Sequence, residues 1–130
     1  MKVAQANSDY DLLILGGGCA GLSLAARLAT KNRNYRVAVL ESRDHYTEDR
    51  TWCGWRTEPH FFSDCQTHEW NEWQVIGNRG LTRRGSQRYP YERVDVGAFY
   101  AKAQRVLQAS ASGSLLLGRR VESVWTCPQF

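Results

Sequence analysis

The stretch Tyr10-Asp11-Leu12-Leu13-Ile14-Leu15-Gly16-Gly17-Gly18-Cys19-Ala20-Gly21 decides how this chain folds. Its first half is a short apolar run that ends abruptly in three glycines, as a buried parallel strand does. The segment 20–30 that follows is rich in alanine and leucine, and four of its apolar residues recur at helical spacing: Leu24, Ala25, Leu28 and Ala29. The pattern predicts a strand over 10–15, a glycine turn, and an amphipathic helix over 20–30.

A second apolar run, Arg36-Val37-Ala38-Val39-Leu40-Glu41, follows the predicted helix and ends in an acid. Strand, glycine turn, helix and strand make a βαβ unit of about thirty residues. The predicted fold class is therefore α/β, a Rossmann-like FAD/NAD(P)-binding βαβ fold. Residues 1–9 are a polar N-terminal tail, and residues 10–130 are predicted to be the N-terminal part of this domain.

Several later segments carry weaker patterns. Residues 68–76 fit a strand or an extended cover over the core. Asp95 is a candidate cap for a helix through Leu107, because apolar residues fall on one helical face at Phe99, Ala103, Val106 and Leu107. Two short strands are expected over 114–117 and 121–125, around a turn at Gly118. Since the second strand stops in mid-sheet, we expect a fold that is incomplete at the C-terminus.

Composition narrows the possible functions. The chain carries a net charge of +4, with 42% hydrophobic and 23% charged residues, typical of a globular protein. It contains neither an apolar run long enough to span a bilayer nor a secretory signal, which favours the cytoplasm. Nucleic-acid binding has no supporting motif. A basic cluster can touch lipid headgroups or phosphate, although a solvated loop is the commoner outcome; it comprises Arg79, Arg83, Arg84 and Arg88.

The cysteines favour neither a disulfide framework nor a metal site. No two of them stand in a Cys-x-x-Cys arrangement, and their spacing from the histidines is too wide for a zinc site. We expect free thiols at all four positions, which are Cys19, Cys53, Cys65 and Cys127.

The glycine turn fits the pattern G-x-G-x-x-G, in which each glycine has a physical role. Gly16 permits the tight turn out of the strand, Gly18 lets a pyrophosphate approach the backbone, and Gly21 lets the helix pack against the sheet. The free N–H groups and the positive dipole end of the predicted helix face the phosphates, which makes Cys19 and Ala20 candidate contacts. All five residues are predicted to bind a dinucleotide.

Glu41 follows Gly21 at the interval at which an acid accepts hydrogen bonds from the adenosine ribose. An acid here disfavours a ribose 2′-phosphate, so NADP is the least expected nucleotide at this turn. Arg43 is a candidate contact to the adenosine, with a surface charge as its alternative role. The glycine turn alone does not decide between FAD and NAD.

The most distinctive segment is Asp49-Arg50-Thr51-Trp52-Cys53-Gly54-Trp55. Arg50 can reach a phosphate or flavin oxygen, and its alternative is an ion pair with Asp49. The two tryptophans offer broad apolar surfaces, which can face a ligand or fill the core.

The chain resembles the FAD-dependent lycopene cyclases. The resemblance rests mainly on this segment, and also on Tyr10-Asp11 before the glycine turn and on Gly21-Leu22-Ser23-Leu24-Ala25. Weaker resemblance comes from the aromatic residues Trp70, Trp73, Tyr89, Tyr91, Phe99 and Tyr100. One departure is Gly54, where the family usually has phenylalanine.

The resemblance implies an isomerase with reduced FAD as cofactor and NAD(P)H as its reductant. The linear ends of lycopene or a related carotenoid would close to rings after protonation, without net redox change. It also implies peripheral attachment to a membrane. The catalytic acid is unknown, because no acid of this chain matches a catalytic motif. Two alternatives stay open: another FAD-dependent enzyme of the hydroxylase or geranylgeranyl-reductase type, or an inactive truncated nucleotide-binding remnant.

Overall fold

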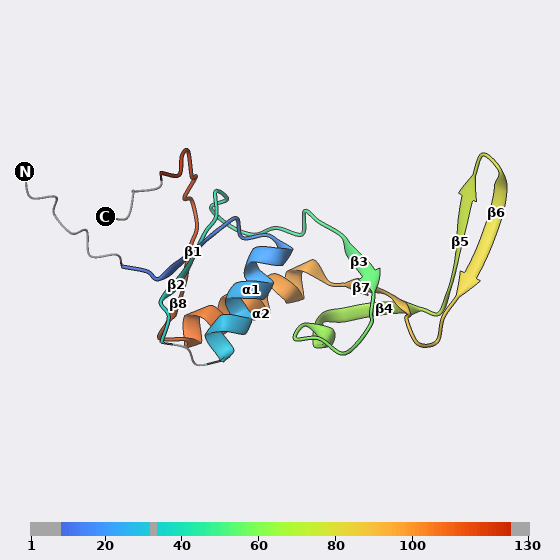
Figure 1. Cartoon of the computed structure of the whole chain (residues 1–130), viewed down its shortest axis with the longest axis horizontal. Helices are drawn as coiled ribbons and strands as arrows, with labels where there is room; N and C mark the ends of the chain where they lie inside the picture. Colours follow the sequence, from blue (N-terminus) through green and yellow to red (C-terminus); the bar gives the residue numbers. More distant parts are fainter. Residues whose placement is uncertain (1–8, 32–33, 126–130) are drawn as a thin grey trace, which may run out of the picture. The chain divides into compact units, whose positions relative to one another are not determined.

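A computed structural model describes residues 9–31 and 34–125 (Figure 1). Its contacts divide the chain into unit 1, Met1–His45 with Lys102–Phe130, and unit 2, Tyr46–Ala101. Sequence patterns placed no boundary at these positions. Among the described residues, no helix is long and apolar enough to cross a membrane.

Unit 1 contains a three-stranded parallel sheet. It consists of β1 (Leu12–Leu15), β2 (Val37–Leu40) and β8 (Gly113–Leu116), in the order β1-β2-β8. Leu12 pairs with Val37, which pairs on its other side with Gly113. The helix α1 (Cys19–Thr30) connects β1 to β2, so the predicted βαβ unit is confirmed.

Burial in the sheet differs from the prediction for the first strand. Val37, Ala38 and Val39 of β2 are buried, because β2 has a neighbour on each side. The prediction of a buried first strand was wrong for the described residues: Leu13 and Leu15 are 51% and 52% exposed. β1 has a neighbouring strand on one side only, and the described elements leave its side chains partly uncovered.

The helix α1 packs against this sheet, but its buried face is rotated from the predicted one. Leu22, Ala25 and Ala26 are buried, whereas Leu24 is 49% exposed. The alanines allow the helix backbone to lie close to the strands. Helical spacing predicts Leu24 on the buried face because it lies four residues, about one turn, before Leu28.

The predicted helix near Asp95 is confirmed as α2 (Val96–Ala109), which begins in unit 2 and ends in unit 1. Asp95 caps it, since its Oδ1 accepts a hydrogen bond of 2.7 Å from the backbone N–H of Ala98. Phe99, Ala103 and Leu107 are buried at helical spacing, as predicted.

Unit 2 has a three-stranded antiparallel sheet in the order β3-β7-β4. The strands are β3 (Trp52–Trp55), β7 (Tyr91–Val94) and β4 (Gln66–Trp70), and the short 3₁₀ helix η1 (Ser63–Cys65) precedes β4. A separate hairpin consists of β5 (Glu72–Gly77) and β6 (Gly80–Gly85). The segment 68–76 is therefore extended, as predicted, but divided between two strands of different sheets.

Aromatic rings build the core of unit 2. Trp52 lies edge to face with Phe99, with 4.5 Å between ring centroids, and Phe99 contacts Phe62 at 4.0 Å. Tyr46 stacks on Tyr100 at 4.0 Å. Such pairs stabilise a core beyond the area they bury.

The predicted strand 121–125 is wrong. These residues carry no regular structure, and Val124 and Trp125 are 70% and 85% exposed. A strand needs a hydrogen-bonded neighbour, and within the described ranges none pairs with this segment. The turn before it is present, with Gly118 at φ +64°.

Candidate dinucleotide-binding site

The glycine turn joins β1 to α1 through a backbone conformation at Gly16 that other residues rarely adopt. Gly16 has φ +101°, in the region that favours glycine, and its N–H donates to the carbonyl oxygen of Leu40 at 2.8 Å. A Cβ on Gly21 would lie 2.0 Å from the carbonyl oxygen of Gly16. Gly21 therefore permits the close approach of helix and strand that the sequence predicted.

The N-terminus of α1 is left open. Gly18 is its N-cap, at φ −82° and ψ −167°, with no capping side chain and no acid in the first turn. A Cβ on Gly18 would meet no described atom within 4 Å. The first N–H groups of a helix have no intrahelical acceptor. Cys19 and Ala20 begin this turn and are exposed, so the site fits an anion such as a pyrophosphate.

Among the described residues, Cys19 at this helix end forms no disulfide, and neither do Cys53 and Cys65. Burial of its sulfur raises the pKa of the Cys19 thiol, and a hydrogen bond with Ser23 acts in the opposite direction. Cys127 lies outside the described residues.

Glu41 connects the end of β2 to the glycine turn. It is only 6% exposed, and its Oε2 accepts a hydrogen bond of 2.8 Å from the N–H of Gly17. Its Oε1 accepts from the backbone N–H and Nε of Arg43, at 2.9 Å and 3.1 Å. Together with the backbone and charge of the nearby chain, these bonds lower the pKa of Glu41 to about 2, with the Arg43 side chain as the largest cause.

We expect this depressed pKa to make unit 1 sensitive to acid. The folded state holds the Glu41 proton less tightly than the unfolded state, whose carboxyl has the usual pKa of 4.5. The stabilisation is therefore complete above about pH 5 and lost as the pH falls toward 2, an effect of about 3 kcal/mol. Urea unfolding of the chain and of Glu41→Gln at several pH values measures it.

In that experiment the stability difference between the two proteins should be largest at neutral pH and shrink in acid. Glu122→Gln, at an exposed carboxylate of the same unit, is the matched control. An acid dependence that is the same in the unmodified chain and in Glu41→Gln would show that Glu41 contributes nothing.

The Arg43 side chain pairs with the Glu41 carboxylate, which the sequence predicted to bind the ribose. Its Nη2 donates to Glu41 Oε2 at 3.2 Å and to the carbonyl oxygen of Gly17 at 3.3 Å. A carboxylate has about four lone-pair positions, and Gly17 and Arg43 already donate four hydrogen bonds to Glu41. A ribose hydroxyl that donates to Glu41 must therefore displace at least one of them. The Arg43 side chain is 29% exposed and has room to move. Both residues stay predicted adenosine contacts.

Arg50 belongs to unit 2 and forms the ion pair that was its alternative role. Its Nε lies 3.5 Å from Oδ2 of Asp49, and its side chain is 66% exposed. Trp52 packs on Phe99 and Tyr100 of the core. Trp55 is 56% exposed beside Trp73 and Tyr91. A Cβ on Gly54 would meet no described atom within 4 Å, so the larger residue usual in the family has space at its first carbon.

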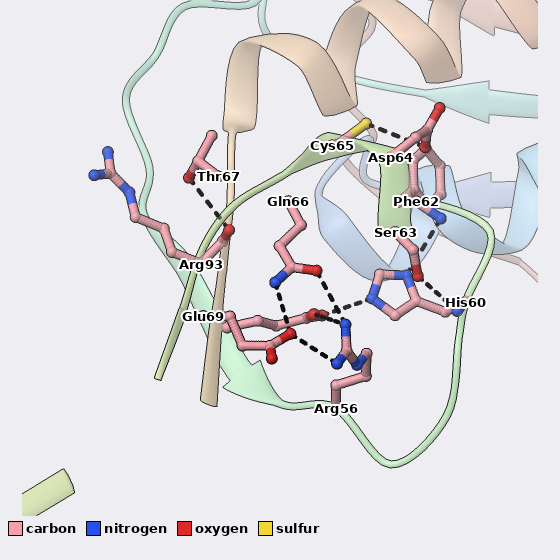
Figure 2. A network of polar contacts seen from close by, with 11 residues as sticks. Arg56, His60, Phe62, Ser63, Asp64, Cys65, Gln66, Thr67, Glu69 and Arg93 are labelled. Carbon is pink, nitrogen blue, oxygen red and sulfur yellow. Dashed lines mark hydrogen bonds and ion pairs between the residues drawn. The ribbon is translucent and has the colours of Figure 1, made fainter. Parts of the chain in front are cut away.

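A second polar cluster surrounds Glu92, a buried residue of β7. Figure 2 shows its neighbours Arg56, His60, Gln66 and Glu69. His60 Nε2 lies 2.6 Å from Oε1 of Glu92, and Arg56 Nη1 lies 3.9 Å from Oε2 of Glu92. Arg56 also pairs with Glu69 at 2.7 Å and donates to Gln66 at 3.1 Å. Oε2 of Glu92 has no hydrogen-bond partner in the described part of the chain, so Arg56 supplies its countercharge. The cluster ties the three strands of this sheet together.

Sequence reasoning missed two contributors to the first site. Gly17, the variable residue of the glycine pattern, donates the bond that joins the turn to Glu41. Ser42 Oγ also donates to Glu41, at 3.3 Å. The adjacent serine was a visible signal, whereas nothing in the pattern distinguished the backbone N–H of Gly17.

This βαβ unit, with its open helix N-terminus and acid at the end of β2, belongs to the Rossmann-like class of α/β proteins. The family model described as lycopene cyclase protein matches residues 11–129. The chain therefore belongs to the lycopene cyclase family, as its resemblance predicted.

Two curated proteins are similar over a short part. Glucose methanol choline oxidoreductase atC of Aspergillus terreus is 51% identical over 43 residues, which is 33% of this chain and 7% of that protein. Dehydrogenase pkfF of Emericella nidulans is 47% identical over 45 residues, which is 35% of this chain and 7% of that protein.

Two solved structures share the fold. Both are of NikD, an unusual amino acid oxidase essential for nikkomycin biosynthesis, in its open form. The chain is 19% identical to one, with a TM-score of 0.50, and 21% identical to its Tyr258Phe mutant, with a TM-score of 0.51. Each match covers 84% of this chain and 43% of NikD, so the chain spans less than half the length of these neighbours.

Proposed function

We propose that this chain is the FAD-binding part of a lycopene cyclase, holding the ADP portion of the cofactor in unit 1. The observation that carries the proposal is the open N-terminus of α1 at Gly18, in a chain of the lycopene cyclase family. The helix N-terminus binds the pyrophosphate through the N–H groups at Cys19 and Ala20. Glu41 binds the ribose, and Arg43 lies beside the adenosine.

Reduced flavin would supply electrostatic stabilisation for positive charge that develops when a linear carotenoid end closes to a ring. NAD(P)H is the proposed reductant. This chain contributes cofactor contacts, and we assign none of its acids as the proton donor. Arg50 is a further proposed contact, because its fork can bind phosphate or flavin oxygens in place of Asp49.

The substrate proposed is lycopene or a related linear carotenoid, and the place of action is the cytoplasmic surface of a membrane. Cyclisation by this route is an isomerisation. The product therefore has the mass of the substrate, although its ends are rings.

Product mass tests this function in the complete protein that carries this chain. Lycopene, FAD and NAD(P)H are supplied without oxygen, and the carotenoids are analysed by chromatography and mass spectrometry. A cyclic product of unchanged mass is expected. The short matches to an oxidoreductase and a dehydrogenase favour a redox flavoenzyme as the second candidate. The assay is repeated with oxygen. A product that has gained hydrogen, or one that forms only in the assay with oxygen and has gained an oxygen atom, would establish that candidate instead.

A further inference from the structure

The hairpin of β5 and β6 is the most exposed ordered segment of unit 2. It forms its own two-stranded sheet (Figure 1). Ile76 pairs with Leu81 in it, and Val75 pairs with Thr82. Every residue of β6 is exposed, and only Trp73 of β5 is half-buried. The turn is made possible by Gly80, at φ +113°.

The end of this hairpin next to the turn is apolar on both faces. Ile76 is 75% exposed, Val75 62% and Leu81 55%. Directly opposite residues of an antiparallel pair share a face, and successive residues alternate. Ile76 and Leu81 therefore lie on one face and Val75 on the other. A protein partner that covers one face of the ribbon would leave the other face exposed, whereas lipid surrounds both.

The same hairpin is positively charged. It carries Arg79 in the turn and Arg83 and Arg84 on β6. The one acid of residues 72–85 is Glu72, which pairs with Gly85 at the end away from the turn. None of these arginines forms an ion pair with another residue in the part of the chain that the structure describes. Arginine binds phosphate oxygens through its planar fork. Apolar side chains near the end of a ribbon, with one arginine in the turn beyond them and two arginines behind them, complement an anionic lipid surface.

We propose that the β5–β6 hairpin, residues 72–85, docks this protein on an anionic membrane surface. The side chains of Val75, Ile76 and Leu81 enter the boundary between headgroups and acyl chains, and the arginines bind lipid phosphates. The outer edges of a two-stranded ribbon have unpaired backbone groups, so the hairpin stays at the interface rather than spanning the bilayer. The docking itself is independent of the proposed function. Only its purpose, access to a carotenoid in the membrane, rests on that function.

Sedimentation with vesicles tests the docking surface without substrate. The vesicles contain about two parts phosphatidylcholine to one part phosphatidylglycerol, and pure phosphatidylcholine vesicles serve as the uncharged comparison. The unmodified chain is expected to bind the anionic vesicles and to be released by salt. Ile76→Asp with Leu81→Asp should weaken binding at least about tenfold, because two charges replace apolar contacts. Replacing Arg79, Arg83 and Arg84 by glutamine should weaken it on the order of 100-fold, about fivefold for each arginine.

Matched controls lie in unit 1. Val124→Asp changes a residue as exposed as Ile76, and Arg119→Gln with Arg120→Gln removes exposed charge elsewhere. Both controls should bind vesicles like the unmodified chain, and circular dichroism should show all variants folded. Titration with FAD is run in parallel, and hairpin variants should bind FAD normally.

Three outcomes would overturn the docking surface. The hairpin variants could bind vesicles as well as the unmodified chain. The control variants could lose binding equally, which would make the attraction non-specific. Gel filtration could show that the Ile76 and Leu81 changes alter only self-association, in which case the hairpin contacts a second copy or another protein. A chain that binds vesicles through the hairpin but never binds FAD would reject the proposed function and leave the docking surface standing.

Discussion

Replacing Gly21 by alanine is expected to prevent unit 1 from folding. The new Cβ would lie 2.0 Å from the carbonyl oxygen of Gly16 and 3.2 Å from Cγ2 of Ile14. Since a real Cβ contact is essentially never shorter than 3.0 Å, α1 would have to move about 1 Å away from the end of β1. The nearest atom belongs to the backbone, so no change of side-chain rotamer relieves the contact.

We expect Gly21→Ala to cost more than about 4 kcal/mol, a large share of the 5–15 kcal/mol that is typical of a whole protein. Far-UV circular dichroism and urea unfolding measure the loss. Gly18→Ala is the matched control in the same turn, because its Cβ would meet nothing within 4 Å. If Gly21→Ala unfolds at the same urea concentration as the unmodified chain, α1 does not pack against β1 through this glycine.

Replacing Gly18 by valine is expected to abolish FAD retention while leaving the protein folded. The space beside Gly18 is open in the structure, and it is where we propose that the pyrophosphate binds. A branched side chain fills that space. Valine is a poorer N-cap than glycine, which costs on the order of 1 kcal/mol and should not unfold the protein.

The measurement is the amount of FAD that remains with the complete protein after gel filtration. Gly54→Val is the control, since the same side chain enters open space on β3. Full FAD content in Gly18→Val would reject the glycine turn as the phosphate site. The same assay applied to Arg50→Ala decides whether Arg50 contacts the cofactor or only pairs with Asp49 at the surface.

The features that the sequence predicted correctly depend on short-range patterns. The βαβ unit follows from an apolar run, three glycines, an alanine-rich helix and a second apolar run. The cap at Asp95 depends on its own side chain and the helix it precedes. Each of these signals is contained within a few turns of chain, so distant partners were not needed to recognise it.

The features that were wrong or missed depend on partners far apart in the sequence. The exposure of Leu13 and Leu15 follows from the position of β1 in the sheet, which no local pattern contains. The segment 121–125 contains the apolar residues Val121, Val124 and Trp125 but has no described neighbour to pair with. Glu92 is buried because His60 and Arg56 reach it from other segments. At the site, charge pairing of Arg43 with Glu41 was overlooked because both residues were considered for the ligand.

The order of strands in unit 1 has a consequence for how the chain folds. β2 pairs with β1 through a short connection, but its other edge pairs with β8 only after the whole of unit 2 has been made. Closing that long loop is slow, because its entropic cost precedes the contacts that offset it. Until β8 pairs, the backbone of β2 has unpaired N–H and C=O groups along one edge, and such an edge can pair with other chains. We therefore expect the newly synthesised protein to be most prone to aggregate before β8 pairs, when the glycine turn between β1 and α1 can already be in place.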